Sequence, residues 1–448
     1  MSVLQAEAIS GVWSRHDRQA LAIVFTLLVG IILTMRLGYV PGETPLPVCL
    51  VLVPAVVWLS VILGIARFDA VALVFYLGVI VVGSINIFFF PENSSLTSFF
   101  LLVVLYSPFV LFFPVRPQTF AIFNNWCVKV ATVLAALGVM QFLLQFIIPN
   151  SELLFSWRFF MPRVFLVEFN SLNYLWWGAS TLKANGFFFL ESAMFGIFIA
   201  RYLALAVASG GKWLSCGIMA CALLLSYSAT AWMTFAVFLM FHFVNVRNAR
   251  EISERLGLAI LGVIGIIVVF MLSEPLHLDR YFDRVTELTE NNPGSSGAQR
   301  FNIPIQNTIG FLYAADTRQI LIGNGPGSVE SFMHVGGTFG NAPTWSKQTI
   351  EYGFLGLLMF SFLITRAVLR AQFYIPIVIM LLLEMLVISP GMLVPANVSI
   401  MYLAFCALTP TRSEASLRPA FPLRGRRAAI SAAGHSEKRS RSDRHSAC

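Results

Sequence analysis

Charged residues are scarce in this chain, and their scarcity is the first guide to its class. Only 12% of its 448 residues are Asp, Glu, Lys or Arg, whereas 57% are hydrophobic and the mean hydropathy is +0.77. A soluble globular domain carries about twice that share of charge, so the composition excludes one. The sequence therefore predicts a polytopic membrane protein of the all-α class.

Patterns typical of disulfide frameworks and metal sites are also lacking. The chain has six cysteines, and five of them fall in long apolar segments where a disulfide framework is not expected. Its six histidines are scattered along the chain without the spacing of metal ligands. We therefore expect no metal ion and no other cofactor.

Apolar runs of roughly 20 residues, the length that crosses the hydrocarbon core, recur about twelve times. The predicted spans are 20–35, 46–66, 70–90, 98–113, 120–148, 192–209, 213–226, 231–244, 256–272, 350–368, 374–388 and 392–408. The first span lacks a cleavage site and follows Arg15 and Arg18, so we expect a retained anchor rather than a signal peptide.

The basic residues predict how these spans are oriented, because cytoplasmic loops collect Lys and Arg. An inside N-terminus at residues 1–19 puts most of them in the cytoplasm and the C-terminus inside as well. Two long polar segments, 149–191 and 274–347, then belong to the outer face of a membrane domain that covers residues 20–410. Residues 411–448 hold nine Lys or Arg against three acids, and we expect a disordered tail attracted to anionic lipid rather than to nucleic acid.

Polar motifs follow one another in order at the predicted outer ends of the spans. They are 183–192 (KANGFFFLES), 226–230 (SYSAT), Arg300, 323–327 (GNGPG), Asn341 and 351–356 (EYGFLG). In this order they resemble the O-antigen ligase and polymerase superfamily, the Wzy-type membrane glycosyltransferases that polymerise lipid-linked oligosaccharide repeats. The similarity covers about residues 183–368.

The resemblance implies a helical, GT-C-like bundle of about twelve spans in the bacterial inner membrane, with short helices of the second long loop over an outward-open cavity. It implies inverting glycosyl transfer at the periplasmic face, from a polyprenyl-pyrophosphate-linked glycan to another lipid-linked repeat, without a metal ion or a sugar nucleotide. The product would be exopolysaccharide or O-antigen. Membrane lipid, a chain-length regulator and export machinery are the other partners that it suggests.

A pyrophosphate leaving group needs cations where no metal neutralises it, and the outer loops supply candidates. Arg300 is the first choice because the family pattern has an Arg at this place, and Arg280, Arg284 and Arg318 are weaker candidates. Lys183 stands where the family commonly has Arg, so a bidentate contact to phosphate is lost. An ordinary solvated Arg paired with a loop acid is the alternative for Arg300.

Three residues are candidates for the general base that activates the acceptor hydroxyl: Glu191, His334 and Glu351. Glu191 could equally be an acid in the first turn of a helix, and His334 an exposed loop residue. Gly325 lies in a glycine run that is either an amide nest for an anion or a tight reversal, and we favour the reversal.

Three charged residues fall well inside predicted spans, where a charge costs about 2.5 to 3.5 kcal/mol on insertion scales. Arg201 lies on the same predicted helix as Glu191 and could reach a lipid phosphate. An internal ion pair or an aqueous cavity is the alternative, and we favour it for Lys129 and Glu384.

A ligase and a transporter are the alternatives to a polymerase, and each would show a sequence feature of its own. A ligase of the superfamily carries His followed by Asn, Ser or Gln about ten residues before the last glycine motif, but Ala342 and Pro343 occupy those places. His334 and Asn341 could act from a shifted loop, yet the polymerase needs fewer assumptions. A transporter or glycolipid flippase would show two related halves, and the sequence has no convincing repeat between halves.

Overall fold

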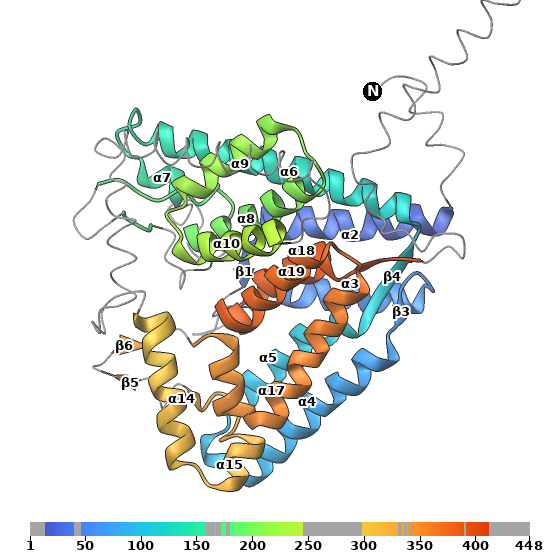
Figure 1. Ribbon diagram of the computed structural model, residues 1–448, viewed down its shortest axis with the longest axis vertical. Helices are drawn as coiled ribbons and strands as arrows, with labels where there is room; N and C mark the ends of the chain where they lie inside the picture. The colour runs from blue at the N-terminus through green and yellow to red at the C-terminus, as the bar shows by residue number, and fades with distance from the viewer. Residues whose placement is uncertain are drawn as a thin grey trace, which may run out of the picture.

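The computed structural model describes residues 14–39, 46–156, 166, 172–175, 180–244, 298–329, 334–335, 338–339, 342–388 and 391–411. This part of the chain is mostly helical with a few short strands, as the sequence predicts (Figure 1). The predicted ninth span at 256–272 and the basic tail from residue 412 lie outside the described residues.

The first half of the chain is built from α2 (Arg15–Thr34), β1 (Gly38–Tyr39), β2 (Leu46–Pro47), α3 (Val48–Ile62), β3 (Arg67–Phe68), α4 (Ala70–Phe89), η1 (Pro91–Asn93), α5 (Leu96–Tyr106), η2 (Ser107–Val110), β4 (Leu111–Val115), α6 (Pro117–Leu144) and α7 (Glu152–Phe155). The second half follows with α8 (Ser192–Ala208), α9 (Trp213–Leu225), α10 (Ala229–Val244), η4 (Ala298–Asn302), α14 (Ile303–Ala314), α15 (Thr317–Ile322), β5 (His334–Val335), β6 (Thr338–Phe339), α17 (Thr344–Arg370), α18 (Ile375–Leu383), η5 (Glu384–Ile388), η6 (Gly391–Leu393), α19 (Pro395–Phe405) and β7 (Leu408–Pro410).

Four of the described helices, α2, α4, α6 and α17, are long and apolar enough to cross a membrane. Other predicted spans coincide with shorter apolar helices of 10 to 17 residues. Local signals start these helices where they begin: Ser14 accepts the N–H of Asp17 at the start of α2, and Pro117 occupies the first turn of α6. The chain therefore has the composition and the helices of a membrane protein.

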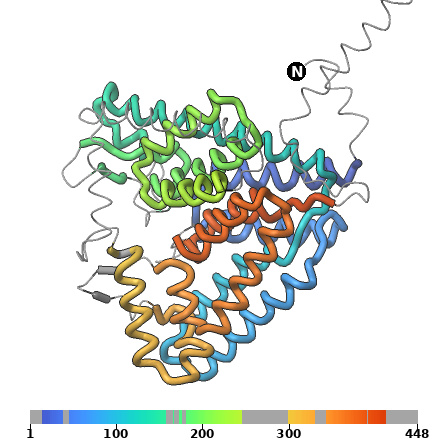
Figure 2. The backbone as a smooth tube through the Cα atoms, viewed as in Figure 1, coloured from blue at the N-terminus to red at the C-terminus, as the bar shows by residue number. Residues whose placement is uncertain are grey.

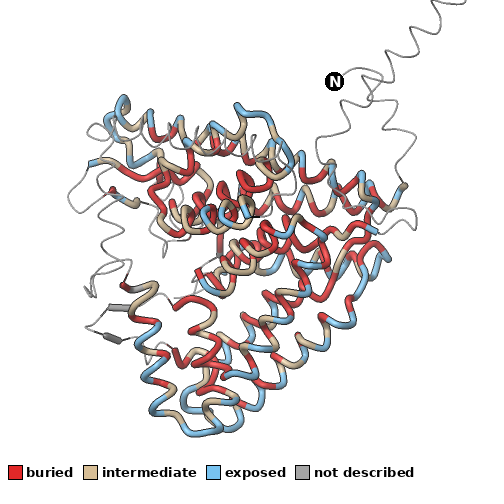
Figure 3. The backbone as a smooth tube through the Cα atoms, in the orientation of Figure 1, coloured by how far each residue is buried: buried red, intermediate tan, exposed pale blue. Residues whose placement is uncertain are grey.

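The helices form two groups that meet along α18 and α19. One group contains α6, α8, α9 and α10, and the other contains α4, α15 and α17, with α4 and α17 running side by side (Figure 2). α19 packs on α2 and α3, while α18 packs on α10 and α8. Burial is strongest at this junction (Figure 3).

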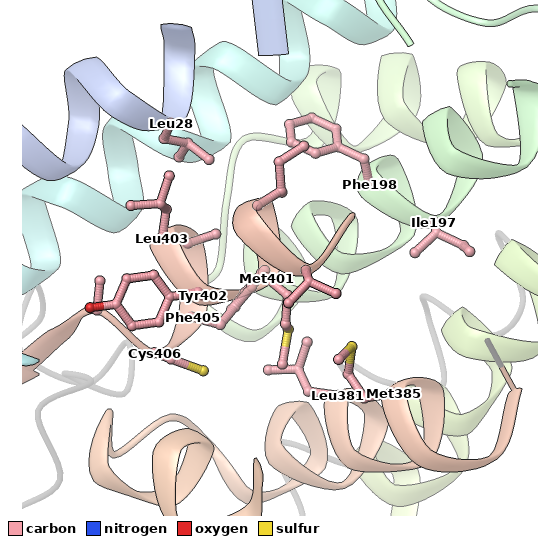
Figure 4. Close-up of a cluster of buried hydrophobic side chains, with 14 of the residues drawn as sticks. Leu28, Ile197, Phe198, Leu381, Met385, Met401, Tyr402, Leu403, Phe405 and Cys406 are labelled. Carbon is pink, nitrogen blue, oxygen red and sulfur yellow. The ribbon is translucent and has the colours of Figure 1, made fainter. Parts of the chain in front are cut away.

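Side chains from α2, α8, α18 and α19 fill the junction (Figure 4). Leu28, Phe198, Leu381 and Tyr402 are among them, and each is nearly or completely buried. A close-packed interior of this kind fixes the relative positions of the helices, so α18 and α19 connect the two groups of helices.

One end of the bundle carries a small sheet and most of its described ion pairs. β4 pairs antiparallel with β3 and parallel with β7, so the segments after α3, α5 and α19 are joined there. The prediction of one helical span over 98–113 was wrong at its end, because Pro108 interrupts the helix and β4 follows from Leu111. We call this the basic end, after Arg67, Arg116 and Arg366.

Asp69 organises the charges at the basic end. Its carboxylate accepts the N–H groups of Val71 and Ala72 at the start of α4 and pairs with Arg366 Nε at 2.9 Å and Arg370 Nη1 at 3.3 Å. Burial by itself would raise the pKa of Asp69, but these hydrogen bonds and cations outweigh it and hold the pKa below its ordinary value. The carboxylate thus fixes α4 to the last turns of α17.

Candidate functional site

The predicted motifs that fall in the described ranges lie at the end of the bundle opposite to the basic end. α2, α4, α6 and α17 each have one terminus at the basic end, through Asp17, Asp69, Arg116 and Arg370. The opposite parts of these four helices contact the motif segments 183–192 and 322–327, as the next paragraphs describe. We call this second end the motif end.

Arg300 contacts the second motif directly. It lies in the π-helical turn η4 that leads into α14, and its Nη1 donates a hydrogen bond to the hydroxyl of Thr230. Thr230 is the second residue of α10 and is buried, while Arg300 is half-buried. Irregular helical turns of this kind are frequent at functional sites. Two motifs that are 70 residues apart therefore meet at one point.

The first motif is fixed in place by glutamines of α6. Gln141 Nε2 donates to Asn185 Oδ1 at 2.8 Å, and Gln141 Oε1 accepts the backbone N–H groups of Asn185 and Gly186 at 3.0 and 2.9 Å. Gln145 binds both the N–H and the carbonyl of Leu182. Lys183, next to Leu182, is 7% exposed. The segment is therefore a rigid part of the site and not a free loop.

The first motif also touches the residue that directly precedes the second motif. The N–H of Ala184 donates to the carbonyl of Leu225 at 3.0 Å. Gly196 lets α8 approach α10 closely, since a Cβ there would lie 2.9 Å from Ala231 Cβ of α10. Buried hydroxyl groups gather at this contact, on Ser192, Ser226, Ser228 and Thr230. Glu191 lies beside them as the N-cap residue of α8.

Arg36 supports the same segment and was missed by sequence reasoning. Its Nε and Nη2 donate to the carbonyl of Phe189 at 3.0 and 2.8 Å, and its Nη1 donates to the carbonyl of Phe155 at 2.7 Å. Burial lowers the pKa of Arg36 to about 10, so it stays charged at neutral pH. One signal could have found it: an Arg at the predicted outer end of a span opposes the bias of basic residues toward the cytoplasm.

The glycine run forms a tight reversal against the start of α17. Gly323, Gly325 and Gly327 all have positive φ, and the N–H groups of Asn324 and Gly325 donate to the carbonyls of Ile350 and Glu351 at 2.8 and 3.1 Å. A Cβ on Gly323 would overlap with the backbone of Glu351. These amides are engaged inside the protein, which agrees with a reversal.

Gly353 and Asn86 complete the contact between the reversal and α17. Gly353 has φ of 65° inside α17 and kinks it, and a Cβ there would overlap with the carbonyl of Leu321. Asn86 Nδ2, from α4, donates to the carbonyls of Ile322 and Glu351. Sequence reasoning passed over Asn86, although a polar residue inside an apolar span is a signal for such a role.

The structure places Glu351 in the interior of this contact. Its side chain is 0% exposed, and Lys347 Nζ lies 3.4 Å from Glu351 Oε1 one turn earlier in α17. The general-base role of Glu351 stays a prediction. Glu191 occupies the N-cap position of α8, the helix whose Gly196 lies against Ser226 and Ser228.

Arg201 is directed at Glu384 inside the bundle. Nε of Arg201 lies 2.6 Å from Glu384 Oε2, Nη2 binds the other carboxylate oxygen, and Nη2 also donates to Asn397 Oδ1 at 3.2 Å. Both charged side chains are at most 1% exposed. The internal ion pair favoured for Glu384 is confirmed, and Arg201 is its partner. Lys129 instead lies on an exposed face of α6.

The remaining candidates fall away from this contact or outside the described residues. Arg318 is exposed and lies 5.9 Å over the ring of Phe89. His334 belongs to the two-residue strand β5, which pairs with β6. The candidates that fall outside the described residues are Arg280, Arg284 and Asn341.

α14 joins the Arg300 contact to the glycine reversal. Thr308 on α14 and Ser346 on α17 share a hydrogen bond of 2.7 Å between their hydroxyl groups. Phe311 of α14 packs with Val329 and Ile350 in a small separate core. The segment that carries Arg300 is therefore anchored to the start of α17.

The arrangement provides cations and hydroxyl groups rather than a metal site. Within the described ranges, no group of three His, Cys, Asp or Glu side chains could hold a metal ion. Arg300 and Lys183 can neutralise an anion, and the buried hydroxyl groups can donate to or accept from a polar substrate. No protein-family model, curated protein or solved structure matches this chain.

Proposed function

We propose that this protein polymerises polyprenyl-pyrophosphate-linked oligosaccharide repeats into exopolysaccharide or O-antigen at the periplasmic face of the bacterial inner membrane. The observation that carries the proposal is the contact of Arg300 with Thr230, beside the segment 183–192. Three motifs that are distant in the sequence converge there, in a membrane protein with a cationic and hydroxyl-rich motif end.

The charge distribution supports this orientation. The basic end carries Arg67, Arg116, Arg366 and Arg370, and the bias of basic residues toward the cytoplasm puts it inside. The motif end then faces the periplasm, where lipid-linked repeats are displayed. Four long apolar helices and seven shorter ones in the described ranges support the proposal of a bundle of about twelve spans.

In the proposed reaction, a hydroxyl group of the acceptor repeat attacks the anomeric carbon of the donor sugar from the face opposite to the pyrophosphate. The bond between that carbon and the pyrophosphate oxygen breaks, and the configuration inverts. Arg300 and Lys183 stabilise the negative charge that grows on the leaving pyrophosphate. A base takes the proton of the acceptor hydroxyl, and our candidate is Glu191, at the start of the helix α8 that packs on α10.

The test is a chromosomal Arg300→Ala replacement, with Arg318→Ala as the matched control because Arg318 is exposed and away from Thr230. Membrane levels are checked by blot, and surface and secreted polysaccharide is sized. We expect Arg300→Ala to abolish long polymer and to accumulate single lipid-linked repeats, while Arg318→Ala makes normal polymer. Full-length polymer with Arg300→Ala would contradict the proposal, and polymer that is made but not attached to its acceptor would favour a ligase.

A further inference from the structure

An exposed apolar surface follows the outer sides of α4 and α17, which run side by side (Figure 1). Both helices are long and apolar enough to cross a membrane, and a continuous apolar surface on such helices is covered by the acyl chains of lipids. The rings of Phe75 and Phe362 stack across the contact with their centroids 5.1 Å apart. Exposed apolar side chains recur at helical spacing, at Val74, Leu77 and Val81 on α4 and at Leu355, Leu358 and Phe362 on α17.

Arg366 lies where this apolar surface reaches the basic end. It follows the exposed Phe362 by one turn of α17, and Leu369, less than a turn further on, is again exposed. The side chain of Arg366 is 45% exposed, while its Nε is held 2.9 Å from Asp69 Oδ2. Arg366 is therefore an exposed cation in a fixed position at the edge of the apolar surface.

Arg67 brings a second exposed cation to the same place. Arg67 in β3 precedes Asp69 by two residues, and Asp69 also has an extended backbone, so both side chains lie on one face of the chain. Phe68 lies on the other face and contacts Trp58 edge to face at 5.6 Å. Both rings are partly exposed, as is typical of aromatic residues at the membrane–water interface.

The acid at this site does not neutralise its cations. Asp69 is 5% exposed and is shared between Arg366 and Arg370. Three arginines beside one carboxylate leave an excess of two positive charges. Arg370 is itself buried, so the accessible cations are Arg67 and Arg366.

We propose that Arg67 and Arg366 bind the phosphate groups of an anionic phospholipid whose acyl chains lie along α4 and α17. Arg suits phosphate because its guanidinium donates two parallel hydrogen bonds, and basic side chains between membrane helices bind anionic headgroups. Apolar surface leads directly into the cations, so the site fits an anionic head joined to acyl chains rather than an acidic peptide. An excess of two charges matches the two phosphodiester groups of cardiolipin.

This lipid site does not depend on the proposed glycosyl transfer. It lies at the basic end, away from Arg300, and follows from the exposed side chains of α4, α17 and β3 alone. Failure of either proposal therefore leaves the other standing.

The experiment titrates the purified full chain in dodecyl maltoside with cardiolipin and records bound lipid by native mass spectrometry. Arg67→Gln removes one exposed charge and leaves the pairs of Asp69 intact, and it should raise the Kd about fivefold. Adding Arg366→Gln should raise the Kd about thirtyfold in total, provided that the melting temperature shows a folded protein. Lys212→Gln is the matched control, because Lys212 is an exposed cation in the turn between α8 and α9, and its Kd should equal that of the wild type.

Three results would overturn the proposal. An unchanged Kd for Arg67→Gln would show that Arg67 does not contact the headgroup. An equal rise for Lys212→Gln would show diffuse attraction to a basic surface instead of a site. Displacement of cardiolipin by an equal concentration of phosphatidylcholine, which has no net charge, would show that the apolar surface alone holds the lipid.

Discussion

Removing Arg201 should leave a carboxylate stranded in the interior of the protein. Arg201→Met keeps an unbranched side chain that can pack in the interior but removes both bonds to Glu384, which is 0% exposed. Breaking a buried ion pair from one side costs about 3–5 kcal/mol, because the remaining charge has no compensation. Glu384→Leu should cost a similar amount for the same reason.

The double replacement separates this cause from loss of packing. With both charges gone, Arg201→Met with Glu384→Leu should be about 3 kcal/mol more stable than either single variant, since apolar replacement of a whole buried pair is often neutral. The free energy of unfolding would be measured by SDS titration of the purified protein in mixed micelles. Additive losses in the double variant would refute the reasoning and show that the two side chains act independently.

Three further predictions concern Asp69, Gly353 and Gln141. The pKa of Asp69 is lower in the folded protein than its ordinary value of 3.8. The ionised carboxylate therefore stabilises the fold fully above pH 3.8, and this stabilisation is lost as the pH falls through the lower folded pKa. Asp69→Asn should flatten that part of a plot of melting temperature against pH. Gly353→Ala should lower the melting temperature for two reasons: the positive φ would cost Ala at least about 1 kcal/mol of stability, and its Cβ would overlap with Leu321. Gly310→Ala should leave the melting temperature unchanged, because a Cβ on Gly310 has open space. Gln141→Leu strands the N–H groups of Asn185 and Gly186, each at about 1–3 kcal/mol, and limited proteolysis should then cut segment 183–192 faster than in the wild type.

Apolar run length predicted much of the fold. The four long helices and the shorter ones coincide with predicted spans, since membrane-crossing segments must be continuous and apolar. The sheet of β3, β4 and β7 was not predicted, because strands of two to five residues carry no periodicity. The interruption of the helix at Pro108 was readable in principle, since Pro removes a backbone donor.

The candidate site was predicted as a set of residues but not as a geometry. The order of motifs predicted one common face, but the contact of Arg300 with Thr230 was not predicted. Pairing between Arg201 and Glu384, 183 residues apart, depends on how α8 and η5 cross, and sequence spacing holds no information on that. The contacts of Arg36 and Gln141 could not be predicted for the same reason, because each side chain binds backbone groups of a segment that is distant in the sequence.

The most direct test of the account is reconstitution of the purified protein in nanodiscs with a polyprenyl-pyrophosphate-linked repeat as its single substrate. The assay contains a chelator and no sugar nucleotide, and the products are sized after release from the lipid. We expect a ladder of polymers from the wild type and from Arg318→Ala, and single repeats alone from Arg300→Ala. No ladder from the wild type with the repeat of its own cell, or an unchanged ladder from Arg300→Ala, would contradict it.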